Sequence, residues 1–317
     1  MTTTTGPTPG ATGAGDDLPG SPPRPRAPLT TAAAPAAVVP ARVPGHVTGR
    51  PLVHRAVGAP PAVVAHRGSS LAHPENTLPA LEAARRDGAS WVEVDLRRTA
   101  DGVVLLLHDP ALDRTTDGRG DVAGTRWRDV RHLDAGTWHS DDHTGVRVPS
   151  FPQLLRWAVG APGTHLLLEM KGVWDTASAA DAVAVVRRYG LASRTVLQSF
   201  QPATVAAVAA AAPEMARGLL VSAEGVGELG PASEPGHAAA VADLVRRHGL
   251  SLVNPGDRLL AADPDLVARL QALGVAVWPW TVDEPARWDA LVRAGVDGLI
   301  TNRPGALLQH LAAGRAA

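Results

Sequence analysis

The chain has 317 residues, a formal net charge of −1 and no cysteine, and its length allows one large domain or two medium ones. The near-zero charge argues against nucleic acid or an anionic membrane as a partner held by bulk electrostatics. The lack of cysteine excludes disulfides and thiolate metal sites. No apolar run approaches the ~18 residues of a membrane-spanning helix, so we expect no stable membrane anchor.

Residues 1–58 are rich in Pro, Ala, Gly and Thr and show neither periodicity nor many large apolar side chains. Such a segment cannot bury enough surface to offset the entropy of ordering it, so we predict that it is disordered. It is also a poor signal peptide, because its start carries no positive charge and prolines interrupt its weak apolar stretch. We therefore expect a cytoplasmic protein with one folded domain at residues 59–317.

Beyond residue 60, short apolar runs alternate with stretches of helical periodicity. The predicted strands are residues 62–66, 91–95, 103–108, 165–170, 195–199, 217–221, 251–254, 275–280 and 297–301. The predicted helices are residues 78–86, 178–189, 202–211, 238–248, 263–272 and 284–294. This alternation implies parallel pairing and an α/β fold, and eight such units predict a (β/α)₈ TIM barrel. A doubly wound open sheet is the competing fold, but no Gly-rich dinucleotide fingerprint favours it.

One predicted strand is in excess of the eight that the barrel needs. Residues 103–108 follow residues 91–97 after a short turn at residues 99–102, which suits a hairpin and not a parallel crossover. An antiparallel hairpin centred on that turn places Glu93 opposite His108. We therefore expect a β-hairpin after the second strand that returns His108 to the acidic residues of that strand.

Residues 110–150 show no alternation of the barrel type and contain many turn-forming residues. They also contain Trp127, Trp138 and a polar run at residues 140–143. We interpret this segment as a small insertion above the mouth of the barrel.

Chemically reactive side chains gather where the predicted strands end, which is where barrel enzymes carry their active sites. In chain order these ends carry His66 and Arg67, Glu93 and Asp95, His108, Glu169 and Lys171, Gln198 and Phe200, Trp278 and Trp280, and Thr301. Glu93 and Asp95 are two residues apart, so both side chains leave the same face of their strand and point into the barrel. Glu169 and Lys171 repeat this spacing.

Three inward carboxylates, Glu93, Asp95 and Glu169, repel one another strongly at low dielectric constant, so a cation must lie between them. Clustered carboxylate oxygens are typical ligands of Mg²⁺ or Ca²⁺, and we predict one such divalent cation. The alternative is a buried ion-pair network that holds the barrel together. Such networks are costly to desolvate, which makes the metal site the preferred hypothesis.

His66 and His108 flank the predicted metal site and suggest general acid–base catalysis near neutral pH. Arg67 and Lys171 lie beside them and indicate an anionic substrate, most naturally a phosphate. Lys171 is the only lysine in the chain, which suggests that a compact ammonium is needed there. Eight other histidines are expected on the surface or in loops, namely His54, His73, His132, His139, His143, His237, His248 and His310.

The chain resembles the glycerophosphodiester phosphodiesterases over nearly all of residues 60–310. The residues that carry the resemblance are His66-Arg67-Gly68, Pro74-Glu75-Asn76-Thr77, Glu93-x-Asp95, His108-Asp109, Glu169-x-Lys171, Gln198-Ser199-Phe200, Trp280-Thr281, Gly295-Val296-Asp297-Gly298, Thr301 and Pro304. The resemblance implies a metal-dependent barrel enzyme that hydrolyses glycerophosphodiesters to sn-glycerol 3-phosphate and an alcohol. The small insertion after the second histidine is also a property of that family.

The resemblance also implies roles for single residues. Those that match the metal ligands of the family are Glu93, Asp95 and Glu169; those that match its acid–base pair are His66 and His108; and those that match its phosphate contacts are Arg67 and Lys171. Glu75 matches a position near the metal and the glycerol hydroxyls. Two positions depart from the family pattern: Asp283 stands where the family often has Asn, and Asn302 stands where it usually has Asp.

Trp278 and Trp280 share one face of their strand. Trp278 lies deeper and is expected in the core, whereas Trp280 lies nearer the mouth and is a candidate contact for the glycerol or alcohol group. Large aromatic side chains also fill barrels, so a core role for Trp280 stays open.

Three other functions remain as alternatives. The first is a lipid-directed phosphodiesterase of the phospholipase D type on the same barrel, which an apolar rim in the insertion would favour. The second is a Schiff-base aldolase that uses Lys171 as its nucleophile. The third is a phosphate-binding protein with a degraded site. The sequence leaves open the alcohol group, the identity of the ion, the oligomeric state, which histidine is the base, and whether water or the glycerol 2-hydroxyl attacks.

Overall fold

The computed structural model describes residues 53–226, 231–233 and 236–316. The disorder predicted for residues 1–58 therefore falls, except for residues 53–58, outside the described part of the chain. Within that part, nine strands form one sheet in the order β8-β7-β6-β5-β4-β2-β1-β9, and β3 pairs with β2 alone. The strands are β1 (Ala62–His66), β2 (Trp91–Arg98), β3 (Val104–Leu106), β4 (His165–Met170), β5 (Thr195–Ser199), β6 (Ala216–Val221), β7 (Leu252–Pro255), β8 (Ala276–Val277) and β9 (Gly298–Thr301).

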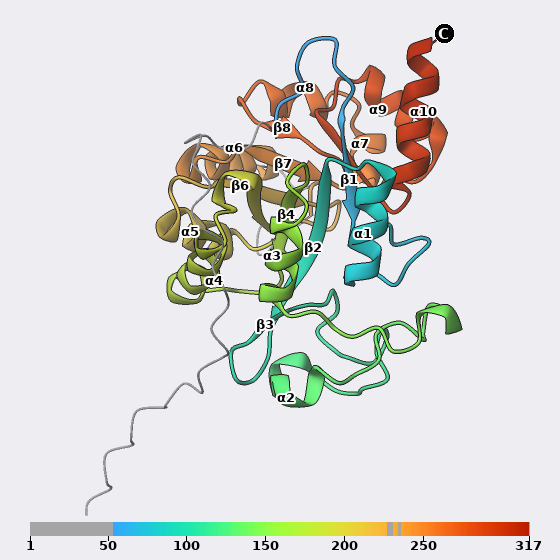
Figure 1. Cartoon of the computed structure of the whole chain (residues 1–317). Coiled ribbons are helices and arrows are strands. Elements are labelled where there is room, and N and C mark those ends of the chain that lie inside the picture. The colour runs from blue at the N-terminus through green and yellow to red at the C-terminus, as the bar shows by residue number, and fades with distance from the viewer. Residues whose placement is uncertain (1–52, 227–230, 234–235, 317) are drawn as a thin grey trace, which may run out of the picture. The chain divides into compact units, whose positions relative to one another are not determined.

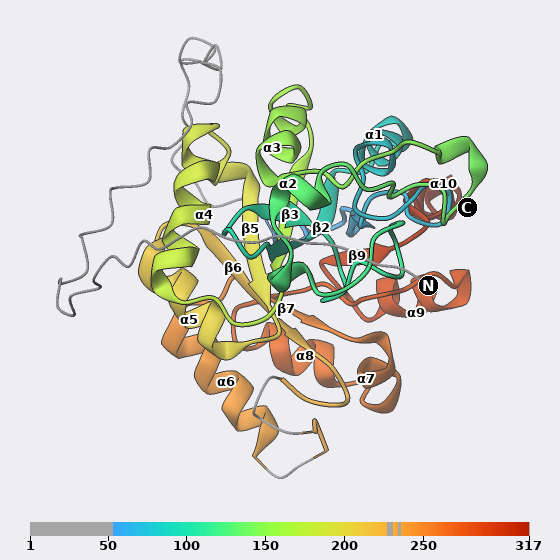
Figure 2. The ribbon, with the colours of Figure 1, turned by 90° about the horizontal axis from the view of Figure 1, so that it is seen from below.

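The two ends of this strand order meet, so the sheet is a nearly closed barrel of eight parallel strands, as predicted. Asp297 N donates to Val277 O at 3.0 Å and Ile300 N donates to Pro279 O at 3.0 Å, which joins β9 to the chain of β8. The strand predicted at residues 275–280 is shorter than expected, because Pro279 lacks the amide hydrogen that a ladder requires. Figure 2 looks into the barrel from one end, with helices around the strands.

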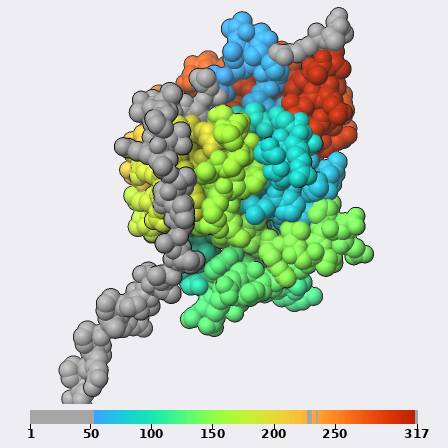
Figure 3. All heavy atoms as spheres, viewed as in Figure 1, coloured from blue at the N-terminus to red at the C-terminus, as the bar shows by residue number. Residues whose placement is uncertain are grey.

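Helices follow most of the parallel strands and cover the outside of the sheet (Figure 1). They are α1 (Leu78–Asp87), α2 (Trp127–Val130), α3 (Phe151–Val159), α4 (Thr176–Arg188), α5 (Pro202–Ala211), α6 (His237–His248), α7 (Asp257–Ala262), α8 (Leu266–Gln271), α9 (Pro285–Arg293) and α10 (Pro304–Ala316). Helices α2, α3, α7 and α10 were not predicted. Trp157 of α3 donates to Glu82 of α1 at 3.2 Å, and Figure 3 shows the two helices side by side.

Two apolar layers follow from the alternation of side chains along each strand. One layer lies between the strands and the helices, and the other fills the inside of the barrel. In the inner layer Trp278 is fully buried and meets Trp91 edge to face, with ring centroids 4.8 Å apart. The core position predicted for Trp278 is therefore confirmed. These two indoles fill the barrel at the beginning of β2, which leaves the opposite ends of the strands for the site.

The hairpin after β2 exists, but its predicted register was wrong by one residue. Arg98 pairs with Val104 and Leu96 with Leu106, and Leu107 N donates to Asp95 O at 3.1 Å, so this register places Val94 and not Glu93 opposite His108. Gly102 takes a left-handed backbone conformation with φ of +79°, which permits a three-residue turn closed by Thr99. A three-residue loop shifts the pairing by one position relative to the turn that the sequence suggested.

The segment at residues 110–150 packs as a satellite of the barrel around its own apolar cluster. Leu112, Val122, Val130 and Val148 are buried together with Leu105 and Leu107 from the hairpin. Figure 1 places this segment, with α2, at the end of the barrel towards which β2 runs. His73 in the loop after β1 meets His143 of the segment, with Nδ1 and Nε2 3.0 Å apart.

The close approach of the loop after β1 to α1 depends on Gly68. Its φ is +85°, and a Cβ there would lie 2.6 Å from the backbone carbon of Ala80. We predict that Gly68→Ala lowers the free energy of unfolding by about 3 kcal/mol or more, because left-handed strain and overpacking add. The matched control is Gly102→Ala, at φ of +79° with nothing within 4 Å of a Cβ, which we expect to cost about 1–2 kcal/mol. Chemical denaturation measures both variants, and an equal loss of unfolding free energy in the two would contradict the role assigned to the Ala80 contact.

Candidate functional site

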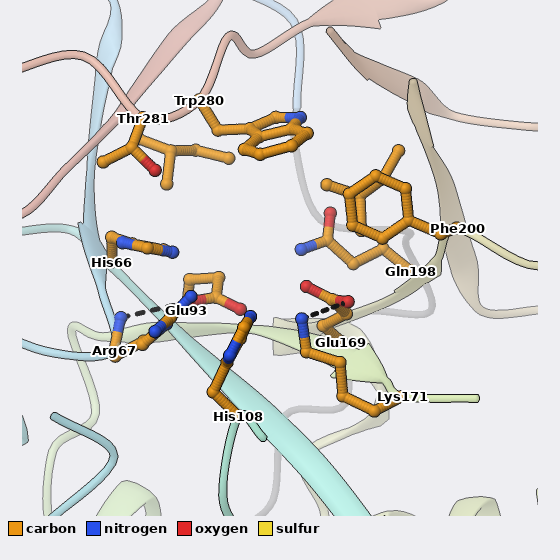
Figure 4. A pocket seen from close by; sticks show the side chains of 12 residues that line it. His66, Arg67, Glu93, His108, Glu169, Lys171, Gln198, Phe200, Trp280 and Thr281 are labelled. Atoms are coloured by element: carbon orange, nitrogen blue, oxygen red, sulfur yellow. Dashed lines mark hydrogen bonds and ion pairs between the residues drawn. The ribbon is translucent and has the colours of Figure 1, made fainter. Parts of the chain in front are cut away.

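A pocket opens at the carboxyl ends of the barrel strands. Its lining consists of His66, Arg67, Glu93, His108, Glu169, Lys171, Gln198, Phe200, Leu220, Trp280, Thr281 and Ile300. Figure 4 shows the labelled side chains around one opening, with His66 and Arg67 on one side and Glu169 and Lys171 on the other. Of the predicted site residues, only Asp95 and Glu75 are not part of this lining, and both contact residues that are.

Three buried carboxylates form the floor of the site. Glu93, Asp95 and Glu169 are 2 %, 1 % and 6 % exposed, and each offers an oxygen within 4.8 Å of the others. Asp95 pairs directly with Glu169 across β2 and β4, so the parallel register brings their side chains together. Glu93 Oε1 is buried and accepts no hydrogen bond from any described residue. An all-oxygen cluster with an unpaired buried oxygen fits a hard divalent cation.

Two cationic side chains meet the carboxylates. Lys171 Nζ lies 2.6 Å from Glu169 Oε1 and 3.1 Å from Asp95 Oδ1. Arg67 Nε lies 3.1 Å from Asp95 Oδ2. The backbone of Arg67 is left-handed, with φ of +57°, and its amide donates to Glu93 Oε2 at 3.0 Å. Arg67 thus meets the acids with both its amide and its guanidinium.

The carboxylates differ in how readily they ionise. Burial, together with the charges of Asp95 and Glu169, raises the pKa of Glu93 well above its usual range. Burial raises the pKa of Glu169 to about 7. Burial also opposes ionisation of Asp95, but Lys171 and Arg67 outweigh it and hold the pKa of Asp95 below its ordinary value. The two protein cations are therefore too few to ionise all three carboxylates, and a divalent cation would supply the missing charge.

The loop between β1 and α1 supplies the support for Asp95. Asn76 Nδ2 donates to Asp95 Oδ2 at 2.7 Å, and Asn76 Oδ1 accepts from Asp95 N at 3.0 Å. Thr77 caps α1 by accepting a hydrogen bond from Ala80 N, as expected of a residue with extended backbone before a helix. Asn76 was not predicted as a site residue, although it lies in the quoted Pro-Glu-Asn-Thr motif.

The two predicted histidines enter the pocket with different partners. His66 Nδ1 lies 2.7 Å from Asn302 Oδ1, and His108 Nδ1 lies 2.6 Å from Asp109 Oδ1. No described residue hydrogen-bonds Nε2 of either ring, so both are free for a ligand. Burial, aided by the charge of Arg67, lowers the pKa of His66 to about 4. Burial also lowers the pKa of His108, against the opposing charge of Asp95.

Arg114 of the insertion links the two sides of the mouth and was not predicted. It donates to Glu75 from Nη1 at 2.9 Å and to Asp109 from Nε at 2.5 Å. Glu75 in turn accepts from Arg67 at 2.8 Å. Arg114 lowers the pKa of Asp109 to about 2, so a charged carboxylate faces the ring of His108. Only the folded insertion brings Arg114 to Glu75, 39 residues away.

Aromatic side chains form the opposite wall of the pocket. Phe200 and Trp280 meet edge to face, with ring centroids 5.3 Å apart. Trp280 Nε1 donates to Asn254 O at 2.7 Å, which fixes the indole plane. Lys171 Nζ lies 5.9 Å from the centroid of the Phe200 ring. The pocket therefore offers a charged side for an anion and an apolar side for carbon groups.

Comparison with known proteins finds a matching family and similar proteins. Residues 66–306 match the model of the glycerophosphoryl diester phosphodiesterase family. A glycerophosphodiester phosphodiesterase of Caldanaerobacter subterraneus is 30 % identical over 248 residues, which are 78 % of this chain and 96 % of that protein.

Solved structures agree with that match. A phosphodiesterase of Oleispira antarctica, solved in complex with the product sn-glycerol-3-phosphate, superposes with a TM-score of 0.70 at 27 % identity, covering 80 % of this chain and 97 % of that one. A glycerophosphodiester phosphodiesterase of Agrobacterium tumefaciens gives a TM-score of 0.64 at 26 % identity, with 77 % and 97 % covered.

The raised pKa of Glu169 predicts a pH-dependent stability for the metal-free protein. Its folded pKa of about 7 lies above the ordinary value of 4.5, so the folded state holds the proton more tightly than the unfolded state. Its contribution to the free energy of unfolding is therefore present below about pH 4.5 and is lost as the pH rises to about 7.

Between about pH 5 and about pH 8, we expect the free energy of unfolding of the parent protein to fall by about 1–3 kcal/mol relative to that of Glu169→Gln. Urea unfolding with a chelator at each pH measures this difference, and Glu224→Gln, an exposed residue, is the control. Parallel stability curves for parent and Glu169→Gln would disprove the shift.

Proposed function

This chain belongs to the glycerophosphoryl diester phosphodiesterase family, and from that premise we propose that it hydrolyses glycerophosphodiesters to sn-glycerol 3-phosphate and an alcohol. One observation carries the proposal: Glu93, Asp95 and Glu169 form a buried cluster, and Glu93 and Glu169 line the same pocket as His66 and His108. The solved relative from Oleispira antarctica that binds sn-glycerol-3-phosphate supports the same product.

The three carboxylates are proposed to hold one divalent cation, Mg²⁺ or Ca²⁺. The unpaired Glu93 Oε1 and the excess of buried negative charge support such an ion. When bound, the ion supplies positive charge for the phosphodiester oxygens. Oxygen ligands suit both ions, so the choice between them stays open.

The phosphate group is proposed to lie between Arg67 and Lys171, which present a guanidinium and an ammonium to the same pocket. Both groups stabilise the negative charge that develops as the phosphodiester is attacked. Glu75 contacts Arg67 and is the proposed acceptor for the glycerol hydroxyls. Trp280 is proposed to pack against the glycerol or the alcohol carbons.

Proton transfer is assigned to His66 and His108. One ring takes the proton of the attacking hydroxyl, and the other gives a proton to the alkoxide that leaves phosphorus. The attacking hydroxyl belongs either to water or to the glycerol 2-position; the second route passes through a cyclic phosphate that water then opens. In both routes the phosphorus–oxygen bond to the alcohol breaks, and the alcohol leaves protonated.

The rival functions gain no support from the site. A Schiff-base enzyme needs a neutral lysine amine, but Asp95 and Glu169 outweigh the effect of burial and raise the pKa of Lys171. A lipid-directed enzyme would favour an apolar rim, yet Trp138 is the one large apolar side chain exposed within residues 110–150, at 39 %. The complete set of catalytic groups also disfavours a degraded binding site.

No helix in the described residues is both long and apolar enough to cross a bilayer. The substrate class proposed here is a small-molecule phosphodiester, with no role for nucleic acid. The cytoplasmic location and the domain limits at residues 59–317 stay predictions.

The deciding experiment measures sn-glycerol 3-phosphate released from glycerophosphocholine by chelator-stripped protein, with Mg²⁺, Ca²⁺ or no ion added. We expect no turnover without an ion and recovery with at least one of the two. If a folded protein releases no product with either ion, glycerophosphocholine is not its substrate, and another phosphodiester should be tested.

The carboxylate cluster makes a separate prediction about ion binding. Glu93→Gln keeps the shape of the side chain and removes one anionic ligand, so the ion should bind at least ~10-fold more weakly and turnover should fall in parallel. Calorimetric titration of the stripped protein measures the affinity, with Glu224→Gln as the matched surface control. An unchanged affinity would show that Glu93 is not a ligand of the ion.

The two histidines lead to a further prediction about turnover. Replacing His66 or His108 with Gln should lower kcat at least ~10²-fold and change KM little, because proton transfer is lost while the phosphate contacts remain. Steady-state kinetics at saturating ion tests both variants. His132→Gln, an exposed histidine of the insertion, serves as control. Near-normal turnover of the His108 variant would refute its catalytic role.

A further inference from the structure

The partner of His66 is itself held by a carboxylate outside the pocket lining. Asn302, which follows β9, donates from Nδ2 to Asp283 Oδ2 at 2.7 Å and from its backbone amide to Asp283 Oδ1 at 2.8 Å. Thr301 Oγ1 also donates to Asp283 Oδ1 at 2.8 Å. Asp283 lies in the loop after β8. These bonds tie the ends of two neighbouring barrel strands together beside His66.

The carboxylate of Asp283 fixes which way the amide of Asn302 points. With its NH₂ group committed to Asp283, Oδ1 faces the opposite way, towards His66 Nδ1 at 2.7 Å and Ser70 Oγ at 2.8 Å. A rotated amide would set its oxygen against the carboxylate, and two acceptors facing each other repel. The orientation is therefore dictated by charge and hydrogen bonding.

This orientation determines the tautomer of His66. An amide oxygen only accepts hydrogen bonds, so Nδ1 of the ring must carry the hydrogen. In the neutral imidazole the lone pair then lies on Nε2, the ring nitrogen for which the described residues provide no partner. The single hydroxyl hydrogen of Ser70 lies within reach of two acceptors, the same amide oxygen at 2.8 Å and His66 O at 2.7 Å.

We propose that Asp283 and Asn302 are positioning residues that hold His66 as the Nδ1–H tautomer, with the Nε2 lone pair available to substrate. The inference rests on the proposed function, because it assigns a task to residues that act on a proposed catalytic group. The second histidine is held differently, since a carboxylate, Asp109, faces its Nδ1 at 2.6 Å. The two rings thus differ in the charge of their direct partner.

The same pair explains the two departures from the family pattern noted in the sequence. By the resemblance, the family often has Asn where this chain has Asp283 and usually has Asp where it has Asn302, and the structure shows that the two side chains bond to each other. Exchanging amide and carboxylate keeps one donor and one acceptor in the pair. Exchanging both residues should therefore preserve the support of His66.

The test compares Asp283→Asn, Asn302→Asp and the double exchange. Asn302→Asp sets two carboxylates against each other, and Asp283→Asn frees the Asn302 amide to rotate. We expect each single variant to lose at least ~10-fold in kcat with KM within ~3-fold. In Asp283→Asn the tautomer is no longer fixed, and in Asn302→Asp the repulsion between the carboxylates displaces residue 302 from His66 Nδ1. The double exchange should recover at least ~10-fold over the Asn302→Asp variant.

The control is Asp289→Asn, which removes a carboxylate that bonds His310 at 2.7 Å outside the pocket; its kcat should not change. Thermal melts confirm that each variant folds. Single variants with full kcat, losses confined to KM, or a double variant no better than Asn302→Asp would each overturn the proposal.

A readout independent of turnover separates this inference from the proposed function. Nitrogen-15 NMR of the histidine rings distinguishes Nδ1–H from Nε2–H tautomers, and the His66→Gln variant assigns the His66 signals. We expect the Nδ1–H form in the parent protein and a mixture of both forms in Asp283→Asn, whether or not glycerophosphocholine is a substrate. The Nε2–H form in the parent would overturn the positioning role while leaving the phosphodiesterase proposal standing.

Discussion

The repulsion among three buried carboxylates is the constraint on which the site depends. Glu93, Asp95 and Glu169 share one floor, and Lys171 and Arg67 neutralise Asp95 without ionising the other two. The arrangement is electrostatically incomplete with protein groups alone, and a divalent cation is the simplest group that completes it. The same shortage of positive charge supports the proposal that the pocket binds a divalent cation and a phosphodiester.

The barrel holds this unfavourable cluster in place because its residues come from separate strands of one rigid sheet. β1 provides His66, β2 provides two acids, and β4 provides Glu169. The loops then add groups that strands cannot offer, such as the left-handed backbone of Arg67, which turns its amide towards Glu93. Two hydrogen bonds between Asn76 and Asp95, one donated by each residue, link the cluster to the loop before α1. The rigid frame supplies positions and the loops supply orientation, a division that suits preorganised electrostatic catalysis.

Orientation also distinguishes the two histidines. A neutral amide holds His66 and a carboxylate holds His108, and each of these partners is fixed in turn by a charged residue, Asp283 or Arg114. Each ring therefore stands at the end of a short chain of hydrogen bonds that reaches outside the pocket. By the proposal made above, residues outside the pocket lining control in this way which ring nitrogen of His66 carries a proton.

The sequence by itself determined the barrel, the inward direction of Glu93 and Asp95, and the set of groups at the strand ends. It could do so because side-chain alternation along a strand and the cap signals of helices are local properties. Only the tertiary structure decided the hairpin register, which the backbone of Gly102 shifts by one residue. It also decided that Arg114 bridges Glu75 and Asp109, and that Asp283 and Asn302 form one pair beside His66. These contacts join loops distant in sequence, and their geometry exists only once the barrel has closed.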